Sequence, residues 1–302
     1  MPSLLIQICL ARQELNKINN YKDIYTNFIQ IGEGAFGKIY KAKKRITNEY
    51  HAIKIIDKEK IKNELRNQLM KNDIDNEFKS YFKYFLNEIT YMKKCCENNI
   101  NSVKLYDYYN TNNELAIAME LCDDSLQSIL NKKENGFNNE EICDIISQLN
   151  NTFKIMNKNH IIHRDLKLDN ILVKYTDNTK TKFIVKLTDY GLSKQLASLS
   201  KFCNTHAGTP LTMAPEILND EEYNDKCDLW SLGVIIYQMF FKQYPYISNS
   251  EIGLLKQINN FEQKLLKKTN DKKLDSLISK LLVKDPKMRI GWDEYFIIFN
   301  QN

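Results

Sequence analysis

The sequence lacks any apolar run long enough to cross a membrane. A membrane-spanning helix needs about 18 or more consecutive apolar residues, whereas the hydrophobic residues here, 43% of the 302, are interrupted by polar ones throughout. The longest apolar run near the start, residues 4–11, has no basic segment before it and no cleavage site of small residues after it. We therefore expect neither a secretory leader nor a membrane partner.

Paired cysteines are also missing. The seven cysteines are scattered, and no two of them are spaced Cys-x-x-Cys. This arrangement argues against a disulfide framework and against a zinc site. It predicts a protein of a reducing compartment, the cytosol or the nucleus.

The chain has little net charge and no concentrated basic patch. The formal charge is +5, and the densest basic stretches, residues 58–62 and 264–273, are diluted by acidic, amide or apolar residues. Such stretches are typical of solvated surfaces and not of a nucleic-acid interface. No nucleic-acid partner is expected.

The length and the hydrophobic periodicity predict an α+β protein with two lobes, since one domain takes roughly 150 residues. Residues 25–56 consist of short strand-like runs, and apolar residues at three- and four-residue steps over 76–96 predict one long helix. Two further strands are expected at 103–109 and 114–121. Residues 1–24 carry no interpretable signal and are treated as an N-terminal extension.

Helical patterns dominate after Asp123, which places the lobe boundary near residues 121–124. We thus expect a small β-rich N-lobe with one long helix over 25–121 and a larger, mostly helical C-lobe over 124–299. Helices are predicted at 125–131, 139–158, 227–241, 250–260, 272–282 and 292–299.

A glycine-rich loop lies between the first two predicted strands. Gly32, Gly34 and Gly37 are spaced G-x-G-x-x-G, a pattern that lets backbone N–H groups approach phosphate oxygens. The same pattern occurs in dinucleotide-binding folds, but there a helix follows the glycines. Here residues 38–42 are strand-like and a lysine-bearing strand comes next, which favours a strand-loop-strand cover over ATP.

Four further motifs follow in order: Ala52-Ile53-Lys54, His163-Arg164-Asp165-Leu166-Lys167-Leu168-Asp169-Asn170, Asp189-Tyr190-Gly191 and Ala214-Pro215-Glu216. Together with the glycine loop they resemble the catalytic domain of the eukaryotic protein kinases, serine/threonine type, over about residues 25–299. The resemblance implies a bilobal protein kinase-like fold, ATP and Mg²⁺ as cofactors, and protein substrates with serine or threonine.

The resemblance also implies roles for single residues in catalysis. Lys54 would hold the α- and β-phosphates, and Glu88 on the long helix would be its partner. Glu77 is the alternative partner, but it lies three turns earlier, about 16 Å along the helix axis. The separation of Lys54 and Glu88, 34 positions, is longer than expected and implies an insertion around residues 57–75.

The His-Arg-Asp segment is the most specific of the motifs. By resemblance, Asp165 would accept the proton of the substrate hydroxyl, and Lys167 would place a charge near the transferred phosphoryl group. Asn170 and Asp189 would be the magnesium ligands, because both supply hard oxygen donors. Tyr190 replaces the usual phenylalanine, and its hydroxyl then needs a partner.

A set of residues around the nucleotide is implied in the same way. Met119 would be the gatekeeper and Glu120 the first hinge residue. The full set expected to bind ATP is Ile31, Gly32, Gly34, Gly37, Ile39, Ala52, Lys54, Met119, Glu120, Cys122 and Leu172.

The segment that ends at Ala214-Pro215-Glu216 resembles an activation segment. Thr209 would bond to Asp165 and Lys167, and Thr205 lies where many relatives are phosphorylated. Our hypothesis is that phosphorylated Thr205 pairs with Arg164, through an upstream activating kinase or trans-autophosphorylation. Asp228 and an ion pair between Arg289 and Glu216 would hold the C-lobe together.

Two other function classes compete with an active protein kinase. A pseudokinase scaffold usually lacks the lysine or one of the two aspartates, and here all three are present. A small-molecule kinase of similar fold is disfavoured by the Gly-Thr-Pro to Ala-Pro-Glu segment, which serves protein substrates.

Overall fold

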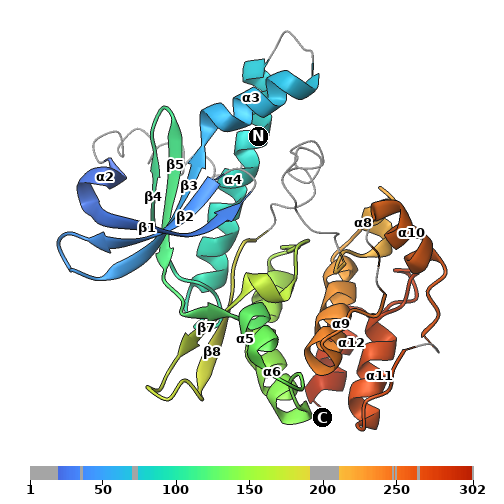
Figure 1. The fold of residues 1–302 in the computed structure, drawn as a ribbon. Helices are drawn as coiled ribbons and strands as arrows, with labels where there is room; N and C mark the ends of the chain where they lie inside the picture. Colours follow the sequence, from blue (N-terminus) through green and yellow to red (C-terminus); the bar gives the residue numbers. More distant parts are fainter. Residues whose placement is uncertain are drawn as a thin grey trace. The chain divides into compact units, whose positions relative to one another are not determined.

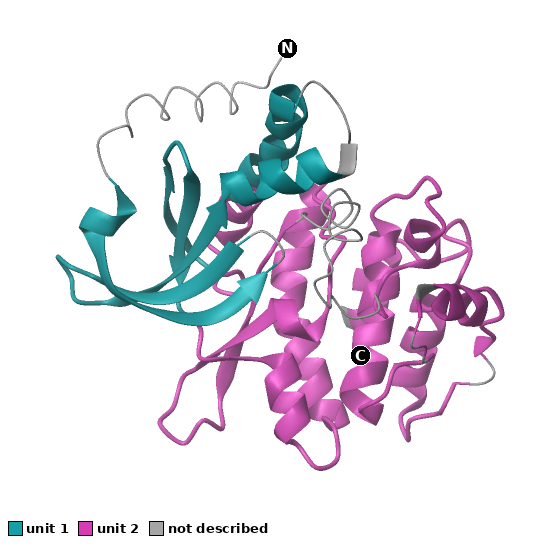
Figure 2. Cartoon of the chain, turned by 45° about the horizontal axis from the view of Figure 1, so that its top comes forward, with its two compact units in different colours: residues 1–89, 104–121, 197–205 teal, residues 90–103, 122–196, 206–302 magenta. Residues whose placement is uncertain are grey.

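The structure is a computed structural model that describes residues 20–34, 37–69, 74–190, 211–246, 248, 250–263 and 266–300. These residues form two compact units, coloured teal and magenta in Figure 2. Unit 1 contains the described residues up to Ile89 and the segment Lys104–Leu121. Unit 2 contains Thr90–Val103 and the described residues from Cys122 onward. The chain enters unit 2 at Cys122, within the predicted boundary, but the segment 90–103 also belongs to unit 2 and not to the β-rich part.

Unit 1 is built on a five-stranded antiparallel sheet with the strand order β1-β2-β3-β5-β4 (Figure 1). Its strands are β1 (Tyr25–Gly34), β2 (Gly37–Lys44), β3 (Tyr50–Asp57), β4 (Leu105–Asn110) and β5 (Glu114–Glu120). Among the strands of this sheet, the adjacent inner strands β3 and β5 carry the most buried side chains. All five lie where the alternation of strand-forming residues predicts them.

Both edge strands of this sheet are irregular. The pairing of β1 with β2 shifts register between Thr26 and Ile29 and again between Gln30 and Gly32. The pairing of β4 with β5 shifts between Leu105 and Asp107. Such bulges bend a strand and increase its local twist.

The N-terminal boundary predicted at Tyr25 falls inside the packed unit. A short helix α2 (Tyr21–Ile24) precedes β1, and Asn20 caps it by accepting a hydrogen bond from the N–H of Lys22. Tyr21 is 1% exposed and joins a core cluster with Tyr25 and Tyr109. Its hydroxyl donates to Glu114 at 2.8 Å. Residues 21–24 therefore pack against the sheet of unit 1, directly before the predicted domain start at Tyr25.

Two helices complete unit 1. The first, α3 (Lys58–Leu69), fills the region where the spacing of Lys54 and Glu88 implies an insertion. The second, α4 (Ile74–Cys96), is the long amphipathic helix predicted over 76–96, and its residues from Thr90 on belong to unit 2.

Unit 2 is mostly helical, as predicted. Its strands β6 (Asp124–Ser125), β7 (Ile171–Tyr175) and β8 (Phe183–Leu187) form a small sheet. Its further helices are α5 (Leu126–Lys132), α6 (Asn139–Lys158), the 3-10 turn η2 (Leu168–Asn170), α8 (Pro215–Leu218), α9 (Lys226–Phe241), α10 (Glu251–Asn259), α11 (Lys272–Leu281) and α12 (Trp292–Asn300). None of the helices in the described ranges is long and apolar enough to cross a membrane.

A buried ion pair ties several of these helices together. Arg289 and Glu216 form two hydrogen bonds, Nη1 to Oε1 at 2.7 Å and Nη2 to Oε2 at 3.0 Å. Their side chains are 0% and 1% exposed. The remaining donors of the guanidinium reach carbonyl oxygens of Val283, Lys284 and Lys226, so every buried N–H has an acceptor. The pairing predicted for Arg289 and Glu216 is confirmed.

Candidate active site

The glycine loop is the tip of the β1–β2 hairpin. Gly34 and Gly37 face each other across the hairpin, and residues 35 and 36 lie outside the described part of the chain. Gly37 is required by close packing, because a Cβ atom there would lie 2.1 Å from the carbonyl oxygen of Ile55 on β3. A Cβ on Gly34 would meet nothing closer than 3.8 Å.

The register of the sheet brings the expected nucleotide residues of unit 1 to one face. Gly32 is opposite Ile39, Ile39 is opposite Lys54, and Ala52 is opposite Met119. Directly opposed residues in an antiparallel pair point the same way, and so do residues two apart on one strand. Ala52 and Met119 are 7% and 5% exposed, so this face is largely apolar next to the lysine.

The remaining expected residues of unit 1 flank that face. Ile31 on β1 is 51% exposed. Glu120, the last residue of β5, is opposite His51 and therefore points to the other face of the sheet, and it contributes its backbone to the segment that leads out of the strand.

Lys54 pairs with Glu88, as predicted, and not with Glu77. The ammonium Nζ of Lys54 lies 2.9 Å from Oε1 of Glu88. The Glu88 side chain is 1% exposed and that of Lys54 is 15% exposed, so the pair is largely shielded from water. A shielded ion pair fixes the position of the ammonium at the end of a stiff strand.

In unit 2, one carboxylate oxygen of Asp165 is held by two neighbours. Oδ2 accepts hydrogen bonds from Nζ of Lys167 at 2.8 Å and from Nδ2 of Asn170 at 2.9 Å. Nδ2 of Asn170 also donates to the backbone carbonyl of Asp165 at 2.8 Å. Both amide protons of Asn170 are thereby directed to Asp165, so the amide oxygen Oδ1 of Asn170 points away from Asp165. These contacts orient Asp165 with its second oxygen, Oδ1, available as a base.

The ammonium of Lys167 stays charged in this arrangement. Burial lowers its pKa, but the Asp165 carboxylate raises it and the net shift is upward, with smaller contributions from Asp169 and Asp189. A cation is therefore maintained beside Asp165 at neutral pH.

Asp228 of α9 anchors the loop that carries Asp165. Its carboxylate accepts the N–H groups of His163 at 2.7 Å and Arg164 at 2.8 Å. Burial raises the pKa of Asp228, and the two backbone donors partly offset that effect. Arg164 has a φ of 68°, a left-handed conformation that a non-glycine residue keeps only where surrounding contacts enforce it.

His163 links this loop to the segment that carries Asp189. Its Nε2 contacts the carbonyl oxygen of Thr188 at 2.9 Å, so Nε2 carries the proton and Nδ1 is the acceptor for the N–H of Asp165 at 3.3 Å. Asp189 also has a left-handed backbone, with a φ of 60°.

Tyr190 is completely buried, and its hydroxyl has a partner that the motif pattern did not identify. The ring packs against His163 with centroids 5.5 Å apart. The hydroxyl lies 2.6 Å from Oγ of Ser102 and 3.3 Å from the carbonyl of Leu187. Ser102 follows α4 in sequence and is far from any motif, so only its pairing with Leu187 reveals its role.

Two expected nucleotide residues belong to unit 2. Leu172 is the second residue of β7, two positions after Asn170, and is opposite Ser125 of β6. Cys122 is the first residue of unit 2 after β5, and the next residue, Asp123, donates its N–H to the carbonyl of Val173. All residues predicted for the site are thus described, with one set in each unit.

The residues present fit a magnesium ion bound through a nucleotide. Within the described ranges there is no cluster of three or more His, Cys, Asp or Glu residues that could hold a metal ion by themselves. Mg²⁺ is usually held by one or two protein oxygens together with phosphate oxygens and water. Asn170 Oδ1 and the Asp189 carboxylate would supply the one or two protein oxygens of such a site.

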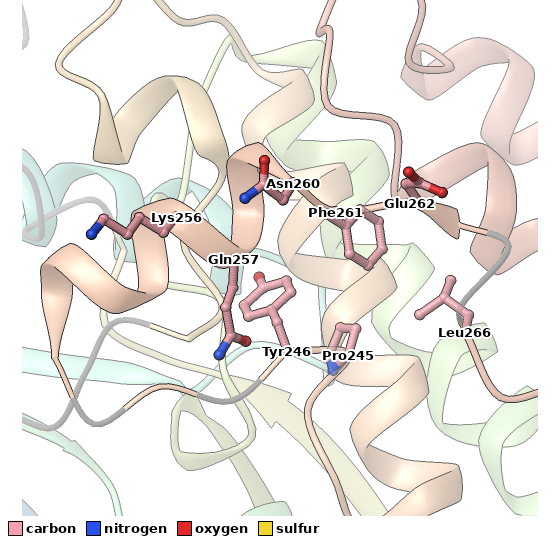
Figure 3. A pocket seen from close by; sticks show the side chains of 8 residues that line it. All are labelled: Pro245, Tyr246, Lys256, Gln257, Asn260, Phe261, Glu262 and Leu266. Atoms are coloured by element: carbon pink, nitrogen blue, oxygen red, sulfur yellow. The ribbon is translucent and has the colours of Figure 1, made fainter.

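A cavity elsewhere in unit 2 contains none of these residues. It has a volume of about 320 Å³ and is lined by Tyr246, Phe261 and Leu266 among others (Figure 3). Its walls include no aspartate, and none of the residues expected to bind ATP or magnesium belongs to it. The chemistry therefore has to be sought at Asp165 and not there.

Residues 191–210 of the expected activation segment, among them Gly191, Thr205 and Thr209, lie outside the described residues. The pairing of Arg164 with a phosphorylated Thr205 stays a prediction. Arg164 itself is described: its guanidinium lies 5.5 Å from the ring centre of Tyr223, and its buried Nε has no hydrogen-bond partner among the described residues.

Comparison with known proteins gives a match to one family over most of the chain. The family model of the protein kinase domain matches residues 25–297. The chain is 30% identical over 278 residues to serine/threonine-protein kinase 33 of Mus musculus, covering 89% of this chain and 53% of that protein. It is 33% identical over 270 residues to serine/threonine-protein kinase atg1 of Dictyostelium discoideum, covering 88% and 37%.

Calcium-dependent protein kinase 4 of Plasmodium berghei is similar as well, 30% identical over 277 residues, with 90% of this chain and 48% of that protein covered. The chain thus spans between about a third and a half of the length of these relatives.

Proposed function

Because the chain belongs to the protein kinase family, we propose that it transfers the γ-phosphoryl group of Mg·ATP to serine or threonine hydroxyls of other proteins. The observation that carries the proposal is the arrangement around Asp165. One of its oxygens is held by Lys167 and Asn170, which leaves the other to accept the proton of a hydroxyl nucleophile.

In this proposal the residues of unit 1 bind the nucleotide. The ammonium of Lys54, held by Glu88, contacts the α- and β-phosphates. The apolar face formed by Ile39, Ala52 and Met119 contacts the adenine ring, and the glycine hairpin approaches the phosphates with its backbone.

Magnesium, when bound, neutralises the developing charge on the phosphates. Asn170 and Asp189 are the protein groups that hold it, and both are anchored: Asn170 by Asp165, and the Asp189 segment by the buried ring of Tyr190. Lys167 keeps its proton because Asp165 raises its pKa, and it stabilises the negative charge on the transferred group.

Regulation through Thr205 is the finer part of the proposal. A phosphate on Thr205 would carry about two negative charges and pair with the guanidinium of Arg164. The buried Nε of Arg164, which has no acceptor among the described residues, supports this idea. An upstream kinase or a second copy of this chain would supply the phosphate. Thr205→Ala should then lower activity, and unchanged activity in that variant would reject the regulatory role.

We place the protein in the cytosol or the nucleus, because the cysteines have no disulfide spacing and Cys95 and Cys227 are free and buried. Its partners in this proposal are protein substrates and an activating kinase.

The decisive experiment is a phosphorylation assay with labelled ATP, Mg²⁺ and a generic basic protein substrate. Asp165→Asn should lower the rate by about 10² to 10⁴-fold, the usual contribution of a positioned base. The matched control is Asp144→Asn, an exposed aspartate of α6, which should leave the rate unchanged. Equal rates for the wild-type protein and Asp165→Asn would sink the proposal.

A further inference from the structure

Helix α3 continues strand β3 without an intervening loop. β3 ends at Asp57 and α3 begins at Lys58, four residues after Lys54. The carboxylate of Asp57 accepts the N–H groups of Glu59 at 2.9 Å and Lys60 at 3.1 Å, which is the bonding of a helix cap. The direction of α3 is therefore set by the strand that carries the catalytic lysine.

Two lysines of α3 lie against two phenylalanines of α4. Nζ of Lys58 is 4.8 Å from the ring centre of Phe82, and Nζ of Lys62 is 5.1 Å from that of Phe78. Each pair of residues is four apart, so each lies on one face of its helix. The two phenylalanine rings also stack on each other with centroids 5.5 Å apart. The result is a ladder of two cation–π contacts between antiparallel helices.

The ammonium of Lys62 has a second contact with α4. Nζ of Lys62 lies 3.3 Å from Oδ1 of Asp75 in the first turn of α4. The Asp75 side chain is 79% exposed, so this ion pair adds little to stability in salt. The two phenylalanine rings therefore determine how α3 lies against α4, and the Asp75 carboxylate is an accessory contact.

Lys58 is the more unusual of the two lysines because its side chain is buried. The residue is 8% exposed, and burial lowers its pKa. Nζ donates to Oδ1 of Asn110, the last residue of β4, at 2.6 Å and to the carbonyl oxygen of Thr111 in the turn between β4 and β5. Its backbone N–H donates to the carbonyl of Asn113 in the same turn. Lys58 thus joins the sheet, the turn and the ring of Phe82 at one point.

The apolar face beneath Lys58 explains why α3 stays in place. Ile61 and Leu65 are both 0% exposed, and together with Lys58 they form the buried stripe of the helix. The outward positions are polar, Glu59, Asn63 and Arg66 among them. Over residues 58–67, the exposed positions are polar, so this part of the helix packs within the chain.

The contacts between α3 and α4 join the same two segments of the chain as the Lys54–Glu88 pair. β3 and α3 form one continuous segment, and α4 faces it with Phe78, Phe82 and Glu88 in that order. Phe82 and Glu88 are six residues apart, about 9 Å along a helix, which is short enough for the helix to turn as a rigid rod. Fixing the rotation of α4 at its two phenylalanines also fixes the direction of Glu88.

We propose that Lys58 and Lys62 are positioning residues: through Phe82 and Phe78 they hold α4 at the rotation in which Glu88 reaches Lys54. This inference rests on the proposed kinase function for its activity readout. The nucleotide itself is not contacted by α3 in this proposal; the effect passes through Glu88.

The test is a double-mutant cycle between Lys58→Met and Glu88→Gln. Lys58→Met keeps the aliphatic stem and removes the charge, and it should lower kcat/KM for ATP about tenfold. In the Glu88→Gln background the same substitution should change kcat/KM less than twofold, because the group it positions is already gone. Equal losses in both backgrounds would overturn the inference.

Two further readouts do not depend on turnover. Calorimetric affinity for Mg·ADP should fall about tenfold in Lys58→Met, and a crystal structure of that variant should show Lys54 and Glu88 separated. If the variant does not fold, Phe82→Leu takes its place, since leucine fills most of the space without a π face. An intact Lys54–Glu88 pair with unchanged Mg·ADP affinity would refute the role of α3.

The matched control is Lys60→Met, a lysine of the same helix that makes no contact with α4 among the described residues. It should match the wild-type protein in kcat/KM and in Mg·ADP affinity. If the wild-type protein is active and Lys58→Met matches Lys60→Met in kcat/KM and Mg·ADP affinity, this inference alone is refuted. If the wild-type protein is inactive, the proposed function is refuted. In that case the crystal structure of Lys58→Met still decides whether Lys58 positions Glu88.

Discussion

Tyr190 illustrates how one added hydroxyl is accommodated in a closed environment. A buried hydroxyl without a partner would cost about 1–3 kcal/mol, and Ser102, itself 1% exposed, provides the partner at 2.6 Å. The hydroxyl pair also connects the segment after α4 to the residue that follows Asp189. A tyrosine at this position is therefore a constraint on the loop as well as a filler of space.

Removal of either hydroxyl should be measurable. Tyr190→Phe leaves Oγ of Ser102 buried without its partner, and we expect the free energy of unfolding to fall by about 1–2 kcal/mol. Ser102→Ala should cost less, because the tyrosine hydroxyl retains the carbonyl of Leu187 at 3.3 Å. Urea unfolding of the two variants and of the double variant measures these changes.

The double variant should be destabilised by less than the sum of the single changes, since both remove one interaction. Tyr175→Phe, a partly exposed tyrosine of β7, serves as the control and should stay within about 0.5 kcal/mol of the wild-type protein. Strict additivity of the two single variants would contradict the pairing.

At the scale of elements, the Arg289–Glu216 pair determines how α8 is held by the segment between α11 and α12. Arg289→Met should lower the free energy of unfolding by about 3–5 kcal/mol, because it leaves the carboxylate of Glu216 buried without its counter-charge. Chemical denaturation measures the loss.

A surface pair between α11 and α12 provides the contrast. Lys280 and Glu294 are 43% and 53% exposed, and Lys280→Met should change stability by less than about 1 kcal/mol. If Arg289→Met were no more harmful than Lys280→Met, the Arg289 pair would not be the clamp described here.

The elements that the sequence predicted are those with a strong periodic pattern. The helices α4, α6 and α9 and the five strands of unit 1 lie within a few residues of the expected ranges, and the predicted α+β kinase fold is confirmed by the family match over residues 25–297. The pairing of Lys54 with Glu88 was also predicted, because Glu88 matches the kinase pattern best, and Glu77 lies three helical turns away from it.

Other elements left no readable pattern. Over residues 58–67, where burial is described, helix α3 buries just two apolar residues, Ile61 and Leu65, so its stripe is too narrow for a periodicity argument. Helix α2 has four residues, fewer than any such window, although Tyr21 is a core residue. Ser102 and Lys58 act through contacts between distant segments, and spacing along one chain does not report those.

Across the whole molecule, buried tyrosines govern the response to alkaline pH. Burial raises the pKa of Tyr25 to about 12 and raises it further for several others, namely Tyr21, Tyr109, Tyr190, Tyr246 and Tyr295. In the unfolded chain these phenols ionise near pH 10. The folded state therefore keeps protons that the unfolded state loses, and stability falls as pH rises above 10.

Each such tyrosine contributes about 1.4 kcal/mol per pH unit once its unfolded form ionises. We expect stability to be insensitive to these groups below pH 9 and to fall steeply between pH 10 and 12. Lys58 acts in the opposite direction, since its lowered pKa favours the fold as the ammonium deprotonates, but it is a single group. Denaturant unfolding at several pH values, with phenolate absorbance as a second signal, tests this; a flat profile up to pH 12 would contradict it.

The irregular edges of the five-stranded sheet affect how the molecule behaves in a crowded solution. A straight exposed strand offers a row of N–H and C=O groups on which a strand from another copy can add, and this is how sheet-based aggregates grow. Here β1 carries two register shifts and β4 carries one. Neither edge presents an evenly spaced row, so fibril growth from this sheet is disfavoured by backbone geometry alone.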